Sequence, residues 1–224
     1  MVHSFSYAVA CKIFLQVTDI FFRNYIMPSN SYEKPDFWSR KAFSEGYPAR
    51  SVYKLEEIDR KFSMIHAGAT VLDLGSAPGS WTSFLLRKLN GNGAVVSVDL
   101  QPLSKSVVGT NLTFLQGDLL CADMVEQVRS FGPYDLVVCD AAPPTTGNRT
   151  VDTARSTGLV EMALYYAELM LKKNANFAVK VFQGGDQQAL LKKMRTVFTV
   201  AKGFKPEACR SESFETYLIG LHKK

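Results

Sequence analysis

Three apolar runs in the first half of the chain lead into residues that could bind a nucleoside. The first run leads into Gly75-Ser-Ala-Pro-Gly79, the second ends at Asp99, and the third is followed by Asp118. Glycine lets the backbone turn sharply and approach a ligand closely. The carboxylate of Asp99 could accept hydrogen bonds from two ribose hydroxyls, and that of Asp118 from an adenine amino group. These groups together predict a site for a nucleoside-containing cofactor.

The spacing of the glycines separates two classes of such cofactor. A dinucleotide site uses Gly-x-Gly-x-x-Gly, so that backbone N–H groups can cradle a pyrophosphate. This loop lacks that spacing and contains Pro78. S-adenosyl-L-methionine carries no phosphate and needs no such cradle, and its ribose and adenine suit Asp99 and Asp118. We therefore expect a site for S-adenosylmethionine rather than for a dinucleotide.

A lysine in a late apolar run is the second candidate for chemistry. Lys180 lies between Phe177-Ala-Val179 and Val181-Phe182. A near-continuous apolar run is typical of a strand that is buried on both faces. Since a buried ammonium group requires partners, we expect a functional role for Lys180 rather than a solvated position at a strand end.

Alternating strands and helices are needed to bring these residues together. Apolar runs predict strands at residues 70–74, 94–99, 112–115, 134–140, 176–182 and 215–221, and helical spacing predicts helices at 51–62, 80–89, 124–130, 152–171 and 187–198. This order predicts a doubly wound α/β fold with a mostly parallel sheet and helices on both faces. Ligands of such sheets bind at the carboxyl ends of the strands, where the glycine loop and both aspartates are expected.

Composition is consistent with one globular domain that binds a polyanion. Of the 224 residues, 46% are hydrophobic and 21% charged, and the net charge is +5. The balance excludes disorder throughout the chain, and the positive excess suits a nucleic acid. The cysteines are too far apart for a zinc site or a disulfide framework, so we expect no metal and a cytoplasmic protein. They are Cys11, Cys121, Cys139 and Cys209.

The first thirty residues differ from the remainder. Residues 1–25 are apolar and aromatic, but Lys12 and Asp19 interrupt them, and the run between these two is too short to span a bilayer. We therefore expect no membrane association. Residues 1–30 are an extension that arises from a start site upstream of Met27 or acts as a targeting segment, which would allow a mitochondrial location. Residues 31–224 form the expected methyltransferase domain.

Three segments resemble the FtsJ/RrmJ family of ribosomal RNA 2′-O-methyltransferases. They are Asp73-Leu-Gly-Ser-Ala-Pro-Gly-Ser-Trp81, Cys139-Asp-Ala-Ala-Pro143 and Val179-Lys-Val-Phe-Gln-Gly184, and the similarity extends over about residues 39–223. The resemblance implies a Rossmann-like, seven-stranded sheet of the class I S-adenosylmethionine-dependent type. Two positions depart from the family: Ser80 replaces a glycine, and Ala142 lies where relatives more often read Met-Ala-Pro-Asn.

The resemblance also implies which residues act in the site. The residues that match the family's lysine–aspartate–lysine–glutamate catalytic set are Lys54, Asp140, Lys180 and Glu215. Those that match its cofactor contacts are Gly79, Trp81, Asp99, Asp118 and Asp140. From the sequence alone, Lys54 and Glu215 could equally be ordinary solvated residues.

Lys180 is the candidate general base for a ribose hydroxyl, which is a weak acid. Burial and the neighbouring cation Lys54 favour loss of its proton, whereas Asp140 and Glu215 favour its charged form. In an alternative role the lysines orient and polarise the oxygen, and the proton leaves after methyl transfer. The sequence does not decide between the two.

The substrate implied by the resemblance is a ribose, with uridine expected, in large-subunit ribosomal RNA, free or within the subunit. We expect a monomer. Transfer RNA or an RNA cap is the alternative substrate, and a non-catalytic ribosome-assembly factor that binds RNA is the alternative function. Base methylation is disfavoured, because Asp140-Ala-Ala-Pro143 replaces the motif of amino-methylating enzymes and Cys139 is expected in the core. The basic residues expected to contact RNA are those of segment 37–50, Lys192, Lys193, Lys205 and Arg210.

Overall fold

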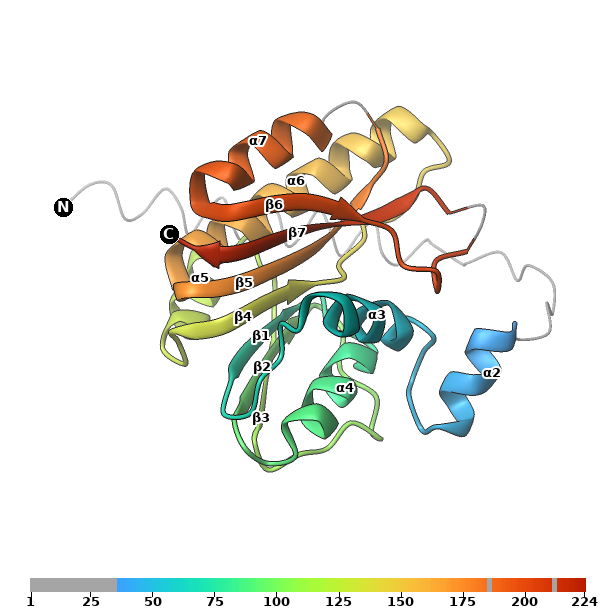
Figure 1. Ribbon diagram of the computed structural model, residues 1–224. Helices are drawn as coiled ribbons and strands as arrows, with labels where there is room; N and C mark the ends of the chain where they lie inside the picture. Colours follow the sequence, from blue (N-terminus) through green and yellow to red (C-terminus); the bar gives the residue numbers. More distant parts are fainter. Residues whose placement is uncertain (1–35, 185–186, 211–212) are drawn as a thin grey trace, which may run out of the picture. The chain divides into compact units, whose positions relative to one another are not determined.

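The computed structural model describes residues 36–184, 187–210 and 213–224, and its centre is one seven-stranded sheet. The strand order is β3-β2-β1-β4-β5-β7-β6 (Figure 1). The strands are β1 Thr70–Leu74, β2 Ala94–Asp99, β3 Leu112–Gln116, β4 Tyr134–Cys139, β5 Leu171–Phe182, β6 Phe198–Phe204 and β7 Glu215–Lys223. Neighbours from β3 to β5 are parallel, whereas β7 is antiparallel to both β5 and β6. The expected doubly wound α/β class is confirmed.

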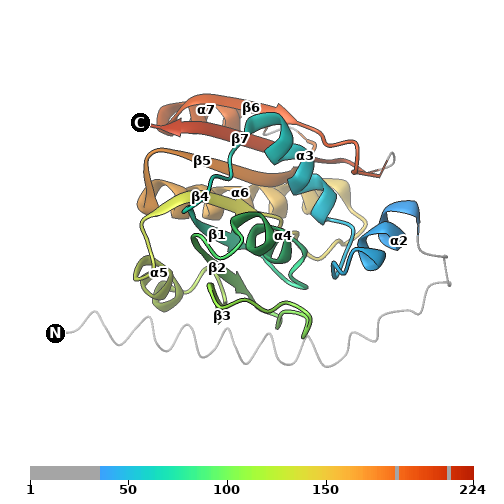
Figure 2. The ribbon, with the colours of Figure 1, turned by 60° about the horizontal axis from the view of Figure 1, so that its bottom comes forward.

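Helices cover both faces of this sheet (Figures 1 and 2). They are α2 Phe37–Ser44, α3 Val52–Phe62, α4 Ser80–Leu89, α5 Ala122–Arg129, α6 Arg149–Met170 and α7 Gln187–Val197. Apolar side chains of α5, α6 and α7 form one core with the sheet, and those of α3 and α4 form a second core with its other face. Within the described residues, none of the helices combines the length and apolar character needed to cross a bilayer.

Two elements were missing from the sequence-based prediction. The helix α2 lies in the basic segment, and Asp36 caps it by accepting a hydrogen bond from the backbone N–H of Ser39 at 2.8 Å. The strand β6 follows α7 without a turn signal, and it contains Lys202 and Gly203, which weaken a strand pattern. The expected N-terminal extension, residues 1–30, lies outside the described residues.

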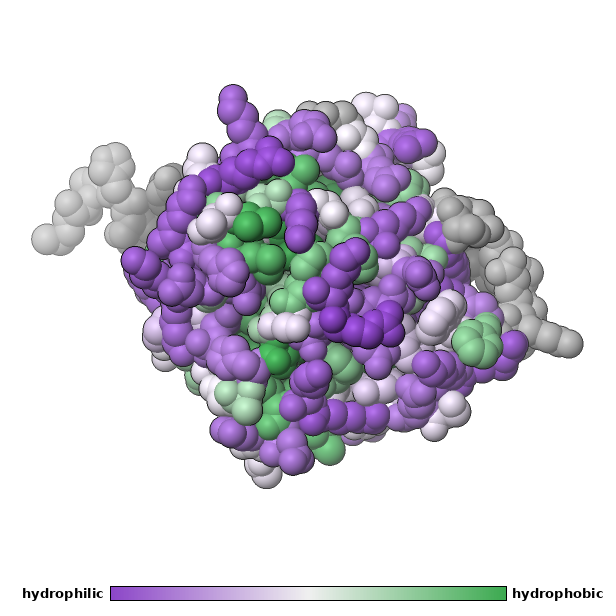
Figure 3. Space-filling model, viewed as in Figure 1, coloured by the Kyte–Doolittle hydropathy of each residue, from purple (hydrophilic) through white to green (hydrophobic). Residues whose placement is uncertain are grey.

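The strand β6 is an edge strand, because it pairs only with β7. Phe198 and Ala201 on this strand are buried, whereas Val200 is 37% exposed. On the face shown in Figure 3, apolar residues gather over β6 and β7 and hydrophilic ones surround them. The exposed Lys202 on the same strand disfavours pairing with a further strand.

The helix α3 is anchored by a buried carboxylate. Glu57 is 8% exposed, and its two oxygens accept hydrogen bonds from the backbone N–H groups of Glu207 and Ala208, at 2.7 and 2.9 Å. The segment that contains Glu207 and Ala208 leads into β7. Glu57 therefore fixes the position of α3 relative to the start of β7.

Replacing Glu57 by alanine should destabilise the protein. The change leaves two backbone N–H groups without their acceptor, and each such loss costs about 1–3 kcal/mol. We expect the free energy of unfolding, measured by urea denaturation with circular dichroism, to fall by about 2–4 kcal/mol. The control is Glu56→Ala, since Glu56 is exposed on the same helix and should change stability by about 0.5 kcal/mol or less. Equal losses in both variants would contradict the anchoring role.

Candidate active site

Two lysine–carboxylate pairs lie together near the carboxyl end of β4. The ammonium nitrogen of Lys54, on α3, is 2.5 Å from Oε1 of Glu215, the first residue of β7. That of Lys180, on β5, is 3.1 Å from Oδ1 of Asp140, the residue after β4. Lys54 and Lys180 are 9% and 8% exposed. The structure thus brings together the four residues that the family resemblance assigned to one catalytic set.

Strand register explains why Lys180 meets Asp140. Cys139 on β4 pairs with Val179 on β5, so the next residues along both parallel strands, Asp140 and Lys180, lie on the same side. Lys180 also donates a hydrogen bond to the backbone carbonyl oxygen of Asp140, at 2.5 Å. Cys139 faces the core, as expected, and burial raises the pKa of its thiol to about 12.

Electrostatics keep Asp140 and Lys54 charged. Burial would raise the pKa of Asp140, but Lys180 and then Lys54 outweigh it and hold that pKa below its ordinary value. Burial would lower the pKa of Lys54, but the carboxylates of Asp140 and Glu215 together raise it. Asp140 is therefore ionised and Lys54 protonated at neutral pH. Charges this deep in a protein require such partners.

Tyr217 is a member of the cluster that sequence reasoning missed. Its hydroxyl donates a hydrogen bond to Oδ1 of Asp140 at 2.7 Å. Burial, followed by the charge of Asp140, raises the pKa of Tyr217 well above its ordinary value, so the hydroxyl remains a donor. The available signal was its position two residues after Glu215, which puts both side chains on the same face of a strand.

Neighbouring atoms lie so close to the loop after β1 that two of its positions require glycine. Gly75 has φ +69°, and a Cβ at this position would lie 2.5 Å from Cβ of Ala141. Gly79 has φ +105° and precedes α4, and a Cβ there would lie 2.6 Å from Cγ2 of Val107. The loop is therefore packed against the segment that follows Asp140.

Backbone hydrogen bonds hold the two aspartates expected to contact a nucleoside. Oδ2 of Asp99 accepts from the backbone N–H of Ala77 at 2.9 Å, and Oδ1 accepts from that of Gln101 at 2.8 Å. Asp118 accepts from the backbone N–H of Leu120 at 2.9 Å. Asp99 ends β2 and Asp118 follows β3, and these parallel strands end at the same edge of the sheet. Each carboxylate keeps further lone pairs with which to accept ligand hydroxyl or amino groups.

The side chain of Trp81 lies in the core. It is 2% exposed, its ring centre is 5.7 Å from that of Tyr217, and its Nε1 donates to the carbonyl oxygen of Ser51 at 2.8 Å. Ser51 is the residue before α3, so the indole connects α4 to the helix that carries Lys54. A contact from Trp81 to a cofactor is therefore left to its backbone N–H in the first turn of α4.

Unpaired polar atoms mark the part of this loop that suits a ligand. Oδ1 of Asp73, Oγ of Ser76 and Oγ of Ser80 are buried without a hydrogen-bond partner among the described residues. Burial raises the pKa of Asp73 to about 7, and the charges of Asp140 and Asp99 add to this effect. Buried polar atoms in native proteins usually have partners. A ligand with an ammonium group and a ribose, such as S-adenosylmethionine, would supply them.

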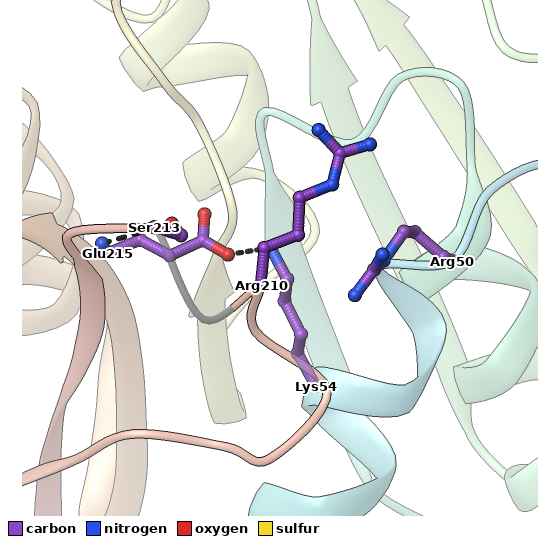
Figure 4. A pocket seen from close by; sticks show the side chains of 5 residues that line it. All are labelled: Arg50, Lys54, Arg210, Ser213 and Glu215. Atoms are coloured by element: carbon purple, nitrogen blue, oxygen red, sulfur yellow. Dashed lines mark hydrogen bonds and ion pairs between the residues drawn. The ribbon is translucent and has the colours of Figure 1, made fainter. Parts of the chain in front are cut away.

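A cavity of about 450 Å³ opens beside the Lys54–Glu215 pair (Figure 4). Its lining residues are Arg50, Lys54, Arg210, Ser213 and Glu215. Three of the five are cations, so the cavity suits an anionic substrate. Within the part of the chain that the structure describes, no group of three histidine, cysteine or acidic side chains could hold a metal ion.

Comparison with known proteins gives the family of this chain. The model of the FtsJ-like methyltransferase family matches residues 47–223. A protein of Treponema denticola named ribosomal RNA large subunit methyltransferase E is 60% identical over 198 residues, which is 88% of this chain and 100% of the relative. A protein of the same name from Oleidesulfovibrio alaskensis is 46% identical over 188 residues, which is 83% of this chain and 90% of the relative.

Solved structures share the fold at low sequence identity. A Plasmodium falciparum protein assigned as a ribosomal RNA methyltransferase has a TM-score of 0.70 and 22% identity, over 79% of this chain and 98% of that one. The Methanococcus jannaschii fibrillarin pre-rRNA processing protein has a TM-score of 0.54 and 15% identity, over 71% and 69%. These structures show the fold alone, whereas the family match and the two curated relatives show that the chain belongs to the FtsJ-like methyltransferase family.

Proposed function

We propose that this protein transfers the methyl group of S-adenosylmethionine to a ribose 2′-hydroxyl, with uridine as the expected nucleoside, of large-subunit ribosomal RNA. The observation that carries the proposal is the buried cluster of Lys54–Glu215 and Lys180–Asp140 next to the glycine loop. The names of the two curated relatives support the RNA substrate. We assign the activity to residues 31–224 as a monomer, and, because these relatives are bacterial, to the cytoplasm.

The proposed cofactor contacts divide between its two ends. Asp99 accepts from the ribose hydroxyls and Asp118 from the adenine amino group. Gly79 and the backbone N–H of Trp81 approach the amino-acid end, whose ammonium group pairs with Asp73. Asp140 lies between this loop and Lys180. The bound cofactor supplies an electrophilic methyl group on a sulfonium centre.

The charged cluster would orient and deprotonate the ribose hydroxyl. Lys54 stays protonated because Asp140 and Glu215 raise its pKa above the ordinary value, so it can polarise the oxygen but cannot accept its proton. We assign the role of base to Lys180, which is held by the carboxylate and the carbonyl oxygen of Asp140. The bound cofactor would supply the methyl group to the 2′-oxygen, and Lys180, in its amine form, would accept the proton of the hydroxyl at Nζ. Positioning and proton transfer are both established sources of rate enhancement.

A methylation assay with labelled S-adenosylmethionine tests the substrate. We expect label in large ribosomal subunits or their RNA, at a single ribose that becomes resistant to alkaline cleavage, and no label in transfer RNA or capped RNA. Label only in transfer RNA or in a cap would overturn the ribosomal assignment. Cofactor binding without label in any RNA would favour a non-catalytic assembly factor.

Substitution of Lys180 tests whether this residue acts as a base or only through its positive charge. Lys180→Arg keeps the charge but does not provide a group that loses its proton near neutral pH, so we expect Lys180→Arg and Lys180→Ala to lower kcat alike, by about 10²–10⁴-fold. Affinity for S-adenosylmethionine, measured by calorimetry, should stay within about threefold, or about 0.7 kcal/mol. The control is Lys173→Ala, an exposed lysine on the same strand. An arginine variant that keeps more than about a tenth of kcat would show that charge alone suffices.

Asp73 should make the ligand-free protein less stable as the pH rises. Its pKa is about 7 in the folded protein, against an ordinary value of 3.8. The stabilising contribution of the protonated group is complete below pH about 4 and is lost as the pH rises through 7. Over this window the wild type should lose up to about 4 kcal/mol of unfolding free energy relative to Asp73→Asn. Urea denaturation of both proteins at several pH values measures the difference, and parallel pH profiles would contradict the assignment.

A further inference from the structure

Two arginines line the cavity together with Lys54 and Glu215. Arg50 lies in the turn before α3, and Arg210 lies in the segment that leads to β7 (Figure 4). Both approach the same oxygen atom, Oδ2 of Asp36. Nη1 of Arg50 is paired with this oxygen, and Nε of Arg210 is 3.8 Å from it. One carboxylate therefore faces two guanidinium groups.

The two arginines differ in how firmly they are held. The side chain of Arg50 is 16% exposed, and its Nη2 donates to the carbonyl oxygen of Ala208 at 2.6 Å. The side chain of Arg210 is 66% exposed. Burial lowers the pKa of Arg50, and the charge of Arg210 lowers it further, which means that the two cations repel each other. A second anion between them would relieve this repulsion.

Asp36 has two separate tasks. Its Oδ1 accepts from the backbone N–H of Ser39 and caps α2, while its Oδ2 faces the two arginines. Its side chain is 38% exposed, so the ion pairs are accessible to solvent and to competing anions. A guanidinium has five N–H donors in a fork that matches the oxygens of a phosphate. Arg50 uses two of these donors in the contacts given above, so further donors remain.

We propose that Arg50 and Arg210 bind a backbone phosphodiester of the RNA next to the target ribose, and that Asp36 occupies this subsite as an internal anion in the free protein. This inference rests on the proposed function. The subsite and the Lys54–Glu215 pair share one cavity. A phosphate held by the arginines would therefore place its neighbouring ribose toward the catalytic cluster. RNA would bind by displacing the carboxylate of Asp36 from Arg210.

The salt dependence of RNA binding tests the phosphate contact. The probe is a short fluorescent oligouridylate, and affinity is measured by anisotropy over a range of salt concentrations. Loss of one phosphate contact lowers the slope of log K against log salt by about 0.7 for single-stranded RNA. We expect this change and about tenfold weaker binding for Arg210→Ala. The matched control is Arg129→Ala, an exposed arginine on α5, which should behave as the wild type does.

Substitution of Asp36 tests the internal anion. Asparagine is as good a helix cap as aspartate, so Asp36→Asn keeps the acceptor for Ser39 and removes only the charge that faces the arginines. We expect this variant to bind the oligouridylate about three- to tenfold more tightly, because the phosphate no longer competes with a carboxylate. The gain should be smaller in the Arg210→Ala background, since the two changes act on one subsite.

The outcomes separate this inference from the proposed function. An unchanged salt slope in Arg210→Ala overturns the phosphate contact, even if binding is weaker. Weaker binding by Asp36→Asn, or an equal gain in both backgrounds, overturns the role of Asp36 as a competing anion. If the wild type methylates large subunits while these tests fail, only the subsite is wrong. If the wild type neither binds nor methylates RNA, the proposed function is wrong as well.

Discussion

The pairing of two buried lysines with two carboxylates is the interaction on which this site depends. Lys54, Asp140, Lys180 and Glu215 come from four separate elements, and a charge without a partner at such a depth would cost several kcal/mol. Asp140 remains ionised and Lys54 remains protonated because the other members of the cluster lie beside them. The cluster therefore requires that α3 and the ends of β4, β5 and β7 be positioned together, and the scaffold is organised around this requirement.

The antiparallel strand β7 makes that arrangement possible. It pairs with β5 so that Glu215 lies opposite Phe182 and Tyr217 lies opposite Lys180. A parallel strand would have its carboxyl end at this edge of the sheet. Because β7 begins here, its first residues lie at the site instead. The helix α3 reaches the same place because Glu57 and the indole of Trp81 hold it to the segment before β7 and to α4. The same elements therefore carry both the contacts that fix their positions and the side chains of the catalytic cluster.

Sequence patterns predicted the parts of this structure whose burial is continuous. Most residues of β1, of β2 and of the second half of β5 are apolar and buried, and Lys180 was expected to be functional because it interrupts such a run. The edge strand β6 was missed because one side faces solvent and its pattern is mixed. Lys54 and Glu215 look locally like ordinary polar residues, so only the family resemblance singled them out. Their contact, like that of Tyr217 with Asp140, arises from tertiary packing that no local pattern encodes.

Two neighbouring aspartates show how the site is divided. Asp140 lies against two lysines, which hold its pKa below the ordinary value. Asp73, on the adjacent strand β1, has a hydroxyl partner in Thr82 but no ion pair among the described residues, and burial raises its pKa to about 7. The protein thus completes the catalytic half of the site with its own charges, whereas the half beside the glycine loop keeps polar atoms unpaired. An unpaired carboxylate here costs stability, and a cationic ligand would remove that cost. Binding of such a ligand and the integrity of the folded state are therefore linked through Asp73.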